Sequence, residues 1–278
     1  MSSDLPGKCV VCGTLTPTRC SDCAKHGTDW MYFCSREHQK TTWFAHKRVC
    51  GVNSNPFQWP LLSKSEQEEW KKIIKTKNSP NGSETWGDHI AKRCERHAET
   101  WLAELAADRW KNNQDPPLEA VREVLYFRRV GYWIRVEAKI RASANEYERT
   151  AIVGQDPFGM LAKTQSEALP WLDVLLWSRE GSRLYPWWTE LHHRLLIYVA
   201  LLGYQHRDPS LFGLDNEEMT QHLGYLNYAL SEIFRVLREQ VSRDLPEQAR
   251  QAIDSLKEET RMMVYEEKTG RITESRLF

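Results

Sequence analysis

The sequence predicts a mainly α-helical protein that begins with a small metal-binding finger. Six of the seven cysteines lie within the first fifty residues, and each lies within a few positions of another cysteine or of a histidine. After residue 62, almost every segment has the composition and apolar spacing of a helix. We expect a finger at residues 1–50, a linker at 51–62 and an all-helical domain at 63–278, with room for a subdivision near 150–165.

The finger contains four closely spaced pairs of metal-ligating side chains. The pairs are Cys9 and Cys12, Cys20 and Cys23, Cys34 and His38, and His46 and Cys50. Sets of four thiolates and imidazoles suit tetrahedral Zn²⁺, whereas Ca²⁺ and Mg²⁺ prefer oxygen ligands. Eight ligands therefore predict two zinc ions. Both sites would be closed by protein side chains, so we expect structural zincs with no open position for an activated water.

Helix geometry argues that the two histidine-containing pairs serve different metals. Cys34/His38 and His46/Cys50 are i, i+4 pairs, which face one direction from a helix. On one straight helix, residues 34 and 46 would lie about 18 Å apart, too far for one zinc to bridge. A kink near Thr41 or Thr42 would shorten this separation. The simpler arrangement gives each pair its own metal and takes the other two ligands of each site from a cysteine knuckle.

These residues resemble the MYND zinc finger, whose pattern is two Cys-x2-Cys knuckles, an aromatic-Cys-x3-Cys-Gln segment, a Trp and a closing His-Lys-x2-Cys. The matching residues are Tyr32-Phe33-Cys34, His38-Gln39, Trp43 and His46-Lys47-Arg48-Val49-Cys50, within roughly 9–50. The resemblance implies a cross-braced pairing, with Cys9, Cys12, Cys34 and His38 on one zinc and Cys20, Cys23, His46 and Cys50 on the other. His38 stands where most members carry cysteine, which makes the first site Cys3His and one charge less negative.

The resemblance also implies a function in protein–protein interaction. Fingers of this family bind extended, proline-containing segments of partner proteins, and Gln39 and Trp43 occupy the positions that line the groove. We expect an indole platform for a proline ring and an exposed backbone edge near residues 31–33 that pairs with the peptide. The alternative for Trp43 is that it forms the small core of the finger itself, and one indole can do both.

The helical domain is predicted element by element from caps, prolines and glycines. The expected helices run from Ser63 or Ser65 to about Lys77, from Ser83 to about Asn112, from Leu118 to about Arg149, over about 166–180, 186–203 and 215–242, and from Pro246 to Lys268. The helix at 118–149 has two apolar faces, which predicts a central position. Nine tryptophans after residue 62 are interpreted mainly as core, with a ligand or peptide groove as the alternative.

The helical domain offers no complete catalytic set. Glu190-x-x-His193 is half of the motif that di-iron bundles use, and the second half is missing, although Glu217, Glu218 and His222 follow on the next helix. Cys94 lies near His89 and His97, a spacing that is common by accident. Lysine methyltransferases that contain this finger have an Asn-His-Ser-Cys segment, which is absent here. We therefore expect an adaptor and not an enzyme. The alternative is a helical ligand-binding or enzymatic domain that the finger targets.

Charge and hydropathy limit the partners. Lys and Arg number 38, as do Asp and Glu, a balance that argues against a dedicated nucleic-acid binder. The longest apolar run, Leu195–Leu202, is too short to cross a bilayer. No apolar signal segment precedes the cysteines, so clustered thiols predict a reducing compartment, the nucleus or cytoplasm, rather than disulfides.

Overall fold

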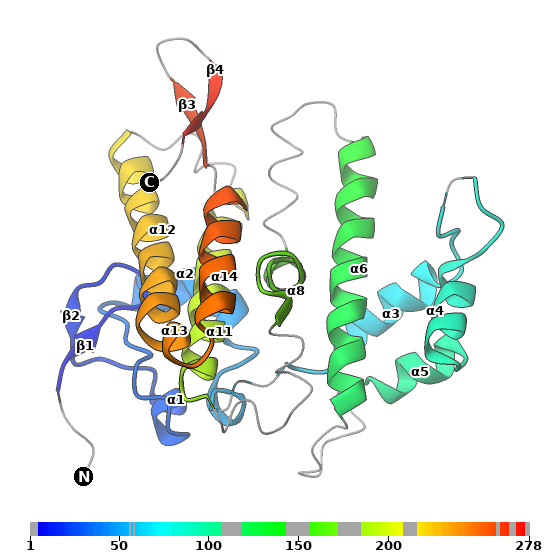
Figure 1. Cartoon of the computed structure of the whole chain (residues 1–278), viewed down its shortest axis with the longest axis horizontal. Helices are drawn as coiled ribbons and strands as arrows, with labels where there is room; N and C mark the ends of the chain where they lie inside the picture. The colour runs from blue at the N-terminus through cyan, green and yellow to red at the C-terminus, as the bar shows by residue number, and fades with distance from the viewer. Residues whose placement is uncertain are drawn as a thin grey trace. The chain divides into compact units, whose positions relative to one another are not determined.

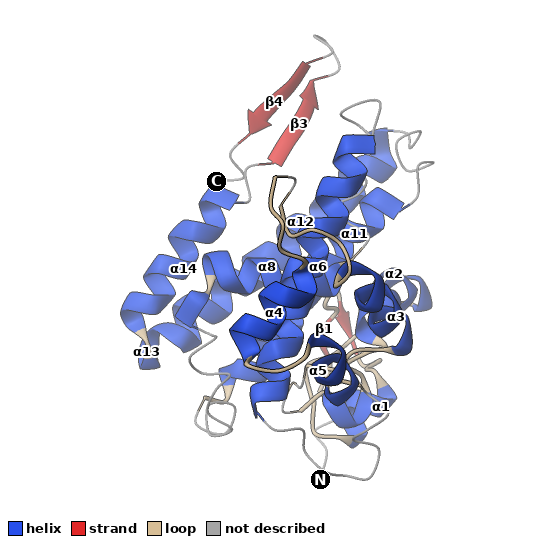
Figure 2. Cartoon of the chain, turned by 90° about the vertical axis from the view of Figure 1, so that its right-hand side faces the viewer, coloured by secondary structure: helices blue, strands red, loops and turns tan. Residues whose placement is uncertain are grey.

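The structure is a computed structural model that describes residues 5–55, 57, 59–79, 81–106, 118–142, 156–171, 185–207, 216–259, 262–266 and 271–275. The chain forms two compact units, one of residues 1–58 with 132–278 and the other of residues 59–131. The structure is mainly helical, as the sequence predicts (Figure 2). The expected boundaries at 50, 62 and near 150–165 stay a prediction, because contacts alone do not show which parts fold independently.

The finger is built from short elements joined by tight turns (Figure 1). Strand β1 (Gly7–Lys8) pairs antiparallel with β2 (Leu15–Thr16). Helix α1 (Ser21–Lys25) contains the second knuckle, and α2 (Arg36–His46) is the finger's main helix. A short 3-10 turn, η1 (Gly51–Asn53), leads out of the finger.

The rest of this unit is a helical bundle with a terminal hairpin. After the second half of α6 (Leu118–Ala142), its elements are α8 (Pro157–Ala168), α11 (Trp187–Arg207), α12 (Asn216–Val236), the π-helical turn η4 (Leu237–Val241), α13 (Ser242–Asp244), α14 (Pro246–Glu259), and strands β3 (Met262–Glu266) and β4 (Arg271–Ser275), which pair antiparallel. Every side chain from Leu191 to Leu201 of α11 is buried. Helix α11 packs against α2, α8 and α12, so the finger's helix covers part of the bundle's core.

The second unit contains α3 (Lys64–Ile73), α4 (Trp86–Cys94), α5 (Ala98–Glu104) and the first half of α6. Its core is aromatic and aliphatic. The buried ring of Trp70 meets the buried ring of Phe127 edge-on, with centroids 4.6 Å apart.

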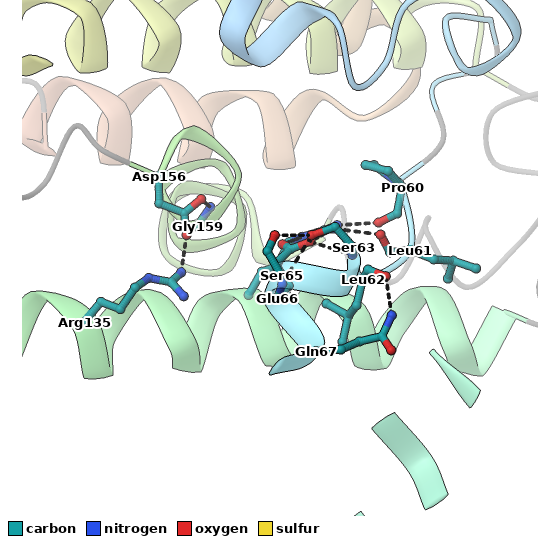
Figure 3. A network of polar contacts seen from close by, with 11 residues as sticks. Pro60, Leu61, Leu62, Ser63, Ser65, Glu66, Gln67, Arg135, Asp156 and Gly159 are labelled. Atoms are coloured by element: carbon teal, nitrogen blue, oxygen red, sulfur yellow. Dashed lines mark hydrogen bonds and ion pairs between the residues drawn. The ribbon is translucent and has the colours of Figure 1, made fainter. Parts of the chain in front are cut away.

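Capping interactions set where the helices of this unit begin. Ser63 caps α3 and forms a capping box with Glu66, so Ser63 and not Ser65 is the cap. The buried guanidinium of Arg128 donates to Glu66 at 3.0 Å and to the carbonyl oxygens of Pro60 and Leu61. Figure 3 labels these three acceptor residues beside the Ser63 cap. This network ties the start of α3 to α6.

Two predicted helix extents are wrong, and one helix of the structure was not predicted. The helix expected over 83–112 breaks at Glu95, whose φ of 52° ends α4 before α5 begins. Helix α8 was not expected; it begins at Pro157 because Asp156 caps it by accepting from the Gly159 amide and proline suits a first turn. The helix expected over 166–180 lies mostly outside the described residues, which continue only to 171 before the next gap. The last helix ends at Glu259 and not at 268. The hairpin that follows has the β-branched and aromatic residues typical of strands.

Most described tryptophans support the core interpretation. Trp70, Trp101, Trp187 and Trp188 are buried. Trp86 and Trp171 are half-buried, Trp133 has 42% of its surface exposed, and Trp110 and Trp177 lie outside the described residues. On α6, Val124, Phe127 and Tyr132 are buried.

Candidate metal centre and interaction surface

Helix α2 brings one histidine to each of two sites. Ser35 caps the helix by accepting from the amide of His38 at 3.2 Å, and Cys34 precedes this cap. His46 is the last residue of α2, and Cys50 follows after a turn. The two histidines are eight residues apart, about 12 Å along the axis. Cys34 and Cys50 are therefore not helical, as the i, i+4 argument assumed, but each histidine-containing pair does serve its own site.

The first site, near the start of α2, consists of Cys9, Cys12, Cys34 and His38. The Sγ atoms of Cys12 and Cys34 lie 3.5 Å apart. Nδ1 of His38 lies 3.6 Å from Sγ of Cys9 and 3.1 Å from Sγ of Cys34. Nδ1 is therefore the nitrogen that faces the three sulfurs.

The second site, near the end of α2, consists of Cys20, Cys23, His46 and Cys50. Sγ of Cys50 lies 3.4 Å from that of Cys20 and 3.7 Å from that of Cys23. Nε2 of His46 lies 3.4 Å from Cys20 and 3.5 Å from Cys23. Here Nε2, and not Nδ1, faces the sulfurs.

Both sets fit zinc. Zinc–sulfur bonds of about 2.3 Å and zinc–nitrogen bonds of about 2.0 Å in a tetrahedron place neighbouring ligand atoms about 3.5–3.8 Å apart. Most of the distances above lie close to this range, and the four ligand atoms of each site lie within 4.8 Å of one another. Each site has three cysteines and one histidine, and the grouping is the cross-braced one that the resemblance implied. The chain thus carries two structural zinc sites.

Crowding of the thiols explains why a divalent cation suits the second site. A hydrogen bond from Cys23, opposed by burial and aided by His46, lowers the pKa of Cys20 to about 3. Burial and the neighbouring Cys20 raise the pKa of Cys50 to about 11. The Cys20 thiolate therefore forms readily, and its negative charge opposes ionisation of Cys50. Zn²⁺ compensates these charges, and its binding must displace protons.

The segment at residues 31–33 is not the exposed edge that was expected. The carbonyl of Met31 accepts from the Cys20 amide at 2.8 Å, and the carbonyl of Tyr32 accepts from the Val10 amide at 2.9 Å. The amide of Phe33 donates to Thr18. All three residues of the segment are buried. Knuckle residues occupy both sides of this segment, so the prediction that a peptide pairs with it is wrong.

Gln39 and Trp43 lie one turn apart on α2. The indole of Trp43 has 42% of its surface exposed, and Gln39 is half-buried. Thr42, Ala45 and His46 form the buried side of the helix. Trp43 is therefore a surface residue in large part and not the core of the finger.

The bundle holds the finger at several points. The guanidinium of Arg194 lies 5.6 Å from the ring centroid of Trp30. Phe57 stacks on His192 with centroids 4.8 Å apart, and its amide donates to Thr189 at 3.2 Å. The predicted linker is thus docked through Phe57, and the finger shares a compact unit with the bundle.

Glu190, His222 and Cys94, which the sequence analysis singled out, make structural contacts. Glu190 pairs with Arg235 at 2.7 Å and with Arg194 at 3.5 Å, and Nε2 of His222 donates to the carbonyl of Leu201. Burial beside Glu123 raises the pKa of the Cys94 thiol to about 11. Among the described residues, the only groups of three or more metal-ligating side chains are the two zinc sites.

Two closed Cys3His sites at the ends of one helix define a structural zinc-finger domain. Residues 9–50 match the family model of the MYND finger. The chain therefore contains a MYND finger, a protein-interaction module that binds two zinc ions. No curated protein and no solved structure matches the chain. No helix in the described part of the chain is long and apolar enough to cross a membrane.

Proposed function

We propose that the chain is a zinc-dependent adaptor whose finger binds short, extended, proline-containing segments of partner proteins through Gln39 and Trp43. The observation that carries the proposal is the exposed indole of Trp43 on a helix that is fixed from its other sides. An aromatic ring that is exposed but held in place presents contact area at little entropic cost, which suits a peptide platform.

Zinc supports this platform indirectly. His38 and His46, five residues before and three residues after Trp43 on α2, belong to the two metal sites. The buried side of α2 packs on α11. Loss of metal would release both ends of the helix that presents Gln39 and Trp43. Peptide binding should therefore require loaded zinc sites.

We also propose that the chain acts as a binding protein and not as an enzyme. Supporting this, Glu190 is engaged by two arginines and the pKa of Cys94 is raised away from the thiolate form. Both zinc sites are also filled by protein ligands, which leaves no coordination position for a substrate.

A peptide selection tests the proposal. A library of randomised short peptides is panned against the zinc-loaded full chain, and separately against the chain after chelator treatment. We expect proline-containing sequences to be enriched only on the loaded protein. Enrichment of the same peptides on the metal-free chain, or enrichment without proline, would contradict the proposed mode of binding.

A further inference from the structure

One ring nitrogen of His38 faces the first metal site, and the other contacts a tyrosine of the bundle. Its Nδ1 faces the sulfurs of the first site, while its Nε2 lies 3.0 Å from the hydroxyl oxygen of Tyr225 on α12. The two rings meet edge-on, with centroids 4.9 Å apart. The two residues are 187 positions apart in the chain, so this contact exists only because α12 packs against the finger.

Coordination chemistry fixes the direction of this hydrogen bond. A histidine that binds zinc through Nδ1 uses the lone pair of that nitrogen, so the proton of the neutral ring must be on Nε2. Nε2–H then donates, and the hydroxyl oxygen of Tyr225 accepts. We propose that Tyr225 is the outer-shell partner of the first zinc site, which fixes the tautomer and the orientation of His38 and so couples zinc retention to the helical bundle.

One comparison within the chain and one with the family pattern support this role. Nδ1 of His46, the corresponding free nitrogen at the second site, is buried and has no hydrogen-bond partner among the described residues. The support is thus particular to the first site. The support also depends on histidine. Most MYND fingers carry cysteine at this position, and a cysteine has no tautomer and no second nitrogen that a hydrogen bond could fix.

A second tyrosine of α12, Tyr228, also packs against the first site. A Cβ added to Gly13, in the turn after the first knuckle, would lie 2.8 Å from the ring of Tyr228. The positive φ of 77° at Gly13 also favours glycine there. The hydroxyl of Tyr228 is buried and has no hydrogen-bond partner among the described residues. Tyr228 therefore packs on the same knuckle as a ring only, which makes it a matched control for Tyr225.

The test measures release of zinc from the full chain into an excess of a colorimetric chelator. In Tyr225→Phe, one of the two zincs should leave faster, by roughly tenfold or more, while the other keeps its wild-type rate. Tyr228→Phe should leave both rates unchanged. Unchanged release in Tyr225→Phe, or equal acceleration in both variants, would overturn the proposal.

A second background separates the hydrogen bond from packing. In His38→Cys, the hydroxyl has no imidazole to support, so adding Tyr225→Phe should not change zinc release further. An equal acceleration in that background would show that Tyr225 acts only through packing. Nitrogen-15 spectra of the zinc-loaded wild type should show His38 bound through Nδ1 and protonated at Nε2, with the Nε2 signal shifted in Tyr225→Phe. The opposite tautomer would also overturn the proposal.

Discussion

The guanidinium of Arg194, buried on α11, lies over the indole of Trp30 in the finger. Arg194 also pairs with Glu232 of α12 at 3.2 Å, so one side chain connects the finger with two helices of the bundle. The finger thus packs into the same compact unit as α11 and α12.

This packing predicts that zinc supports part of the bundle as well as the finger. A domain of the finger's size depends on metal for its fold, and its collapse would expose the side of α11 that α2 covers. Chelation should therefore increase amide hydrogen exchange at Leu195–Leu201, and added zinc should restore protection. Unchanged protection of α11 in the metal-free protein would contradict this coupling.

Metal content and its pH dependence form a second prediction. Protein purified without chelator should contain two zincs per chain. The affinity should fall as the pH is lowered, because protons compete with zinc for thiolates and imidazoles. Chelator competition at several pH values measures this. A single zinc per chain, or an affinity that does not change with pH, would contradict the two Cys3His sites.

The cross-braced grouping can be tested with paired substitutions. Cys9→Ser with Cys34→Ser removes two ligands from the first site, so one tightly bound zinc should remain. Cys9→Ser with Cys20→Ser removes one ligand from each site, so both zincs should bind more weakly. Sequential pairing of the ligands, with both knuckles on one metal, would reverse the two outcomes.

The ion pair of Glu66 and Arg128 predicts a pH-dependent stability. Arg128 and the Ser63 cap, acting against burial, lower the pKa of Glu66 to about 2. This depressed pKa stabilises the fold above the usual carboxylate pKa, and the contribution is lost as the pH falls through about 2. Glu66→Gln keeps an oxygen that can accept from the cap but removes the charge. This substitution should lower the free energy of unfolding by about 3 kcal/mol near neutral pH.

The control for this prediction is Glu68→Gln on the same helix. Glu68 pairs with Lys71 at the surface, so its removal should change stability little. Urea unfolding at several pH values compares the variants, and the difference between wild type and Glu66→Gln should shrink in acid. A difference that is independent of pH would mean that the ion pair is not its source.

The zinc ligands could be predicted from the sequence because each site is made of local pairs with characteristic spacings. The grouping of those pairs was implied by the family resemblance, whereas helix geometry argued only that the two histidine-containing pairs serve different metals. Tyr225 could not be predicted as the partner of His38, since nothing local links positions so far apart. The helix break at Glu95 has no glycine or proline to signal it. Phe57, which packs on the bundle, lies in a segment with the composition of a linker. Such features depend on tertiary packing, which propensity and periodicity do not describe.

The most direct test of the adaptor hypothesis is the affinity of a selected proline-containing peptide for Trp43→Ala, measured by fluorescence anisotropy beside Trp133→Ala. Both tryptophans have 42% of their surface exposed, so the pair separates position from residue type. Loss of a central aromatic contact costs about 2 kcal/mol or more of binding free energy, which is roughly a thirtyfold loss of affinity. Loss of the Gln39 hydrogen bond should cost less, about 1 kcal/mol of binding free energy. We expect Trp43→Ala to lose this affinity with both zincs retained, and Trp133→Ala to bind as the wild type does. Wild-type affinity in a zinc-loaded Trp43→Ala protein would contradict the account.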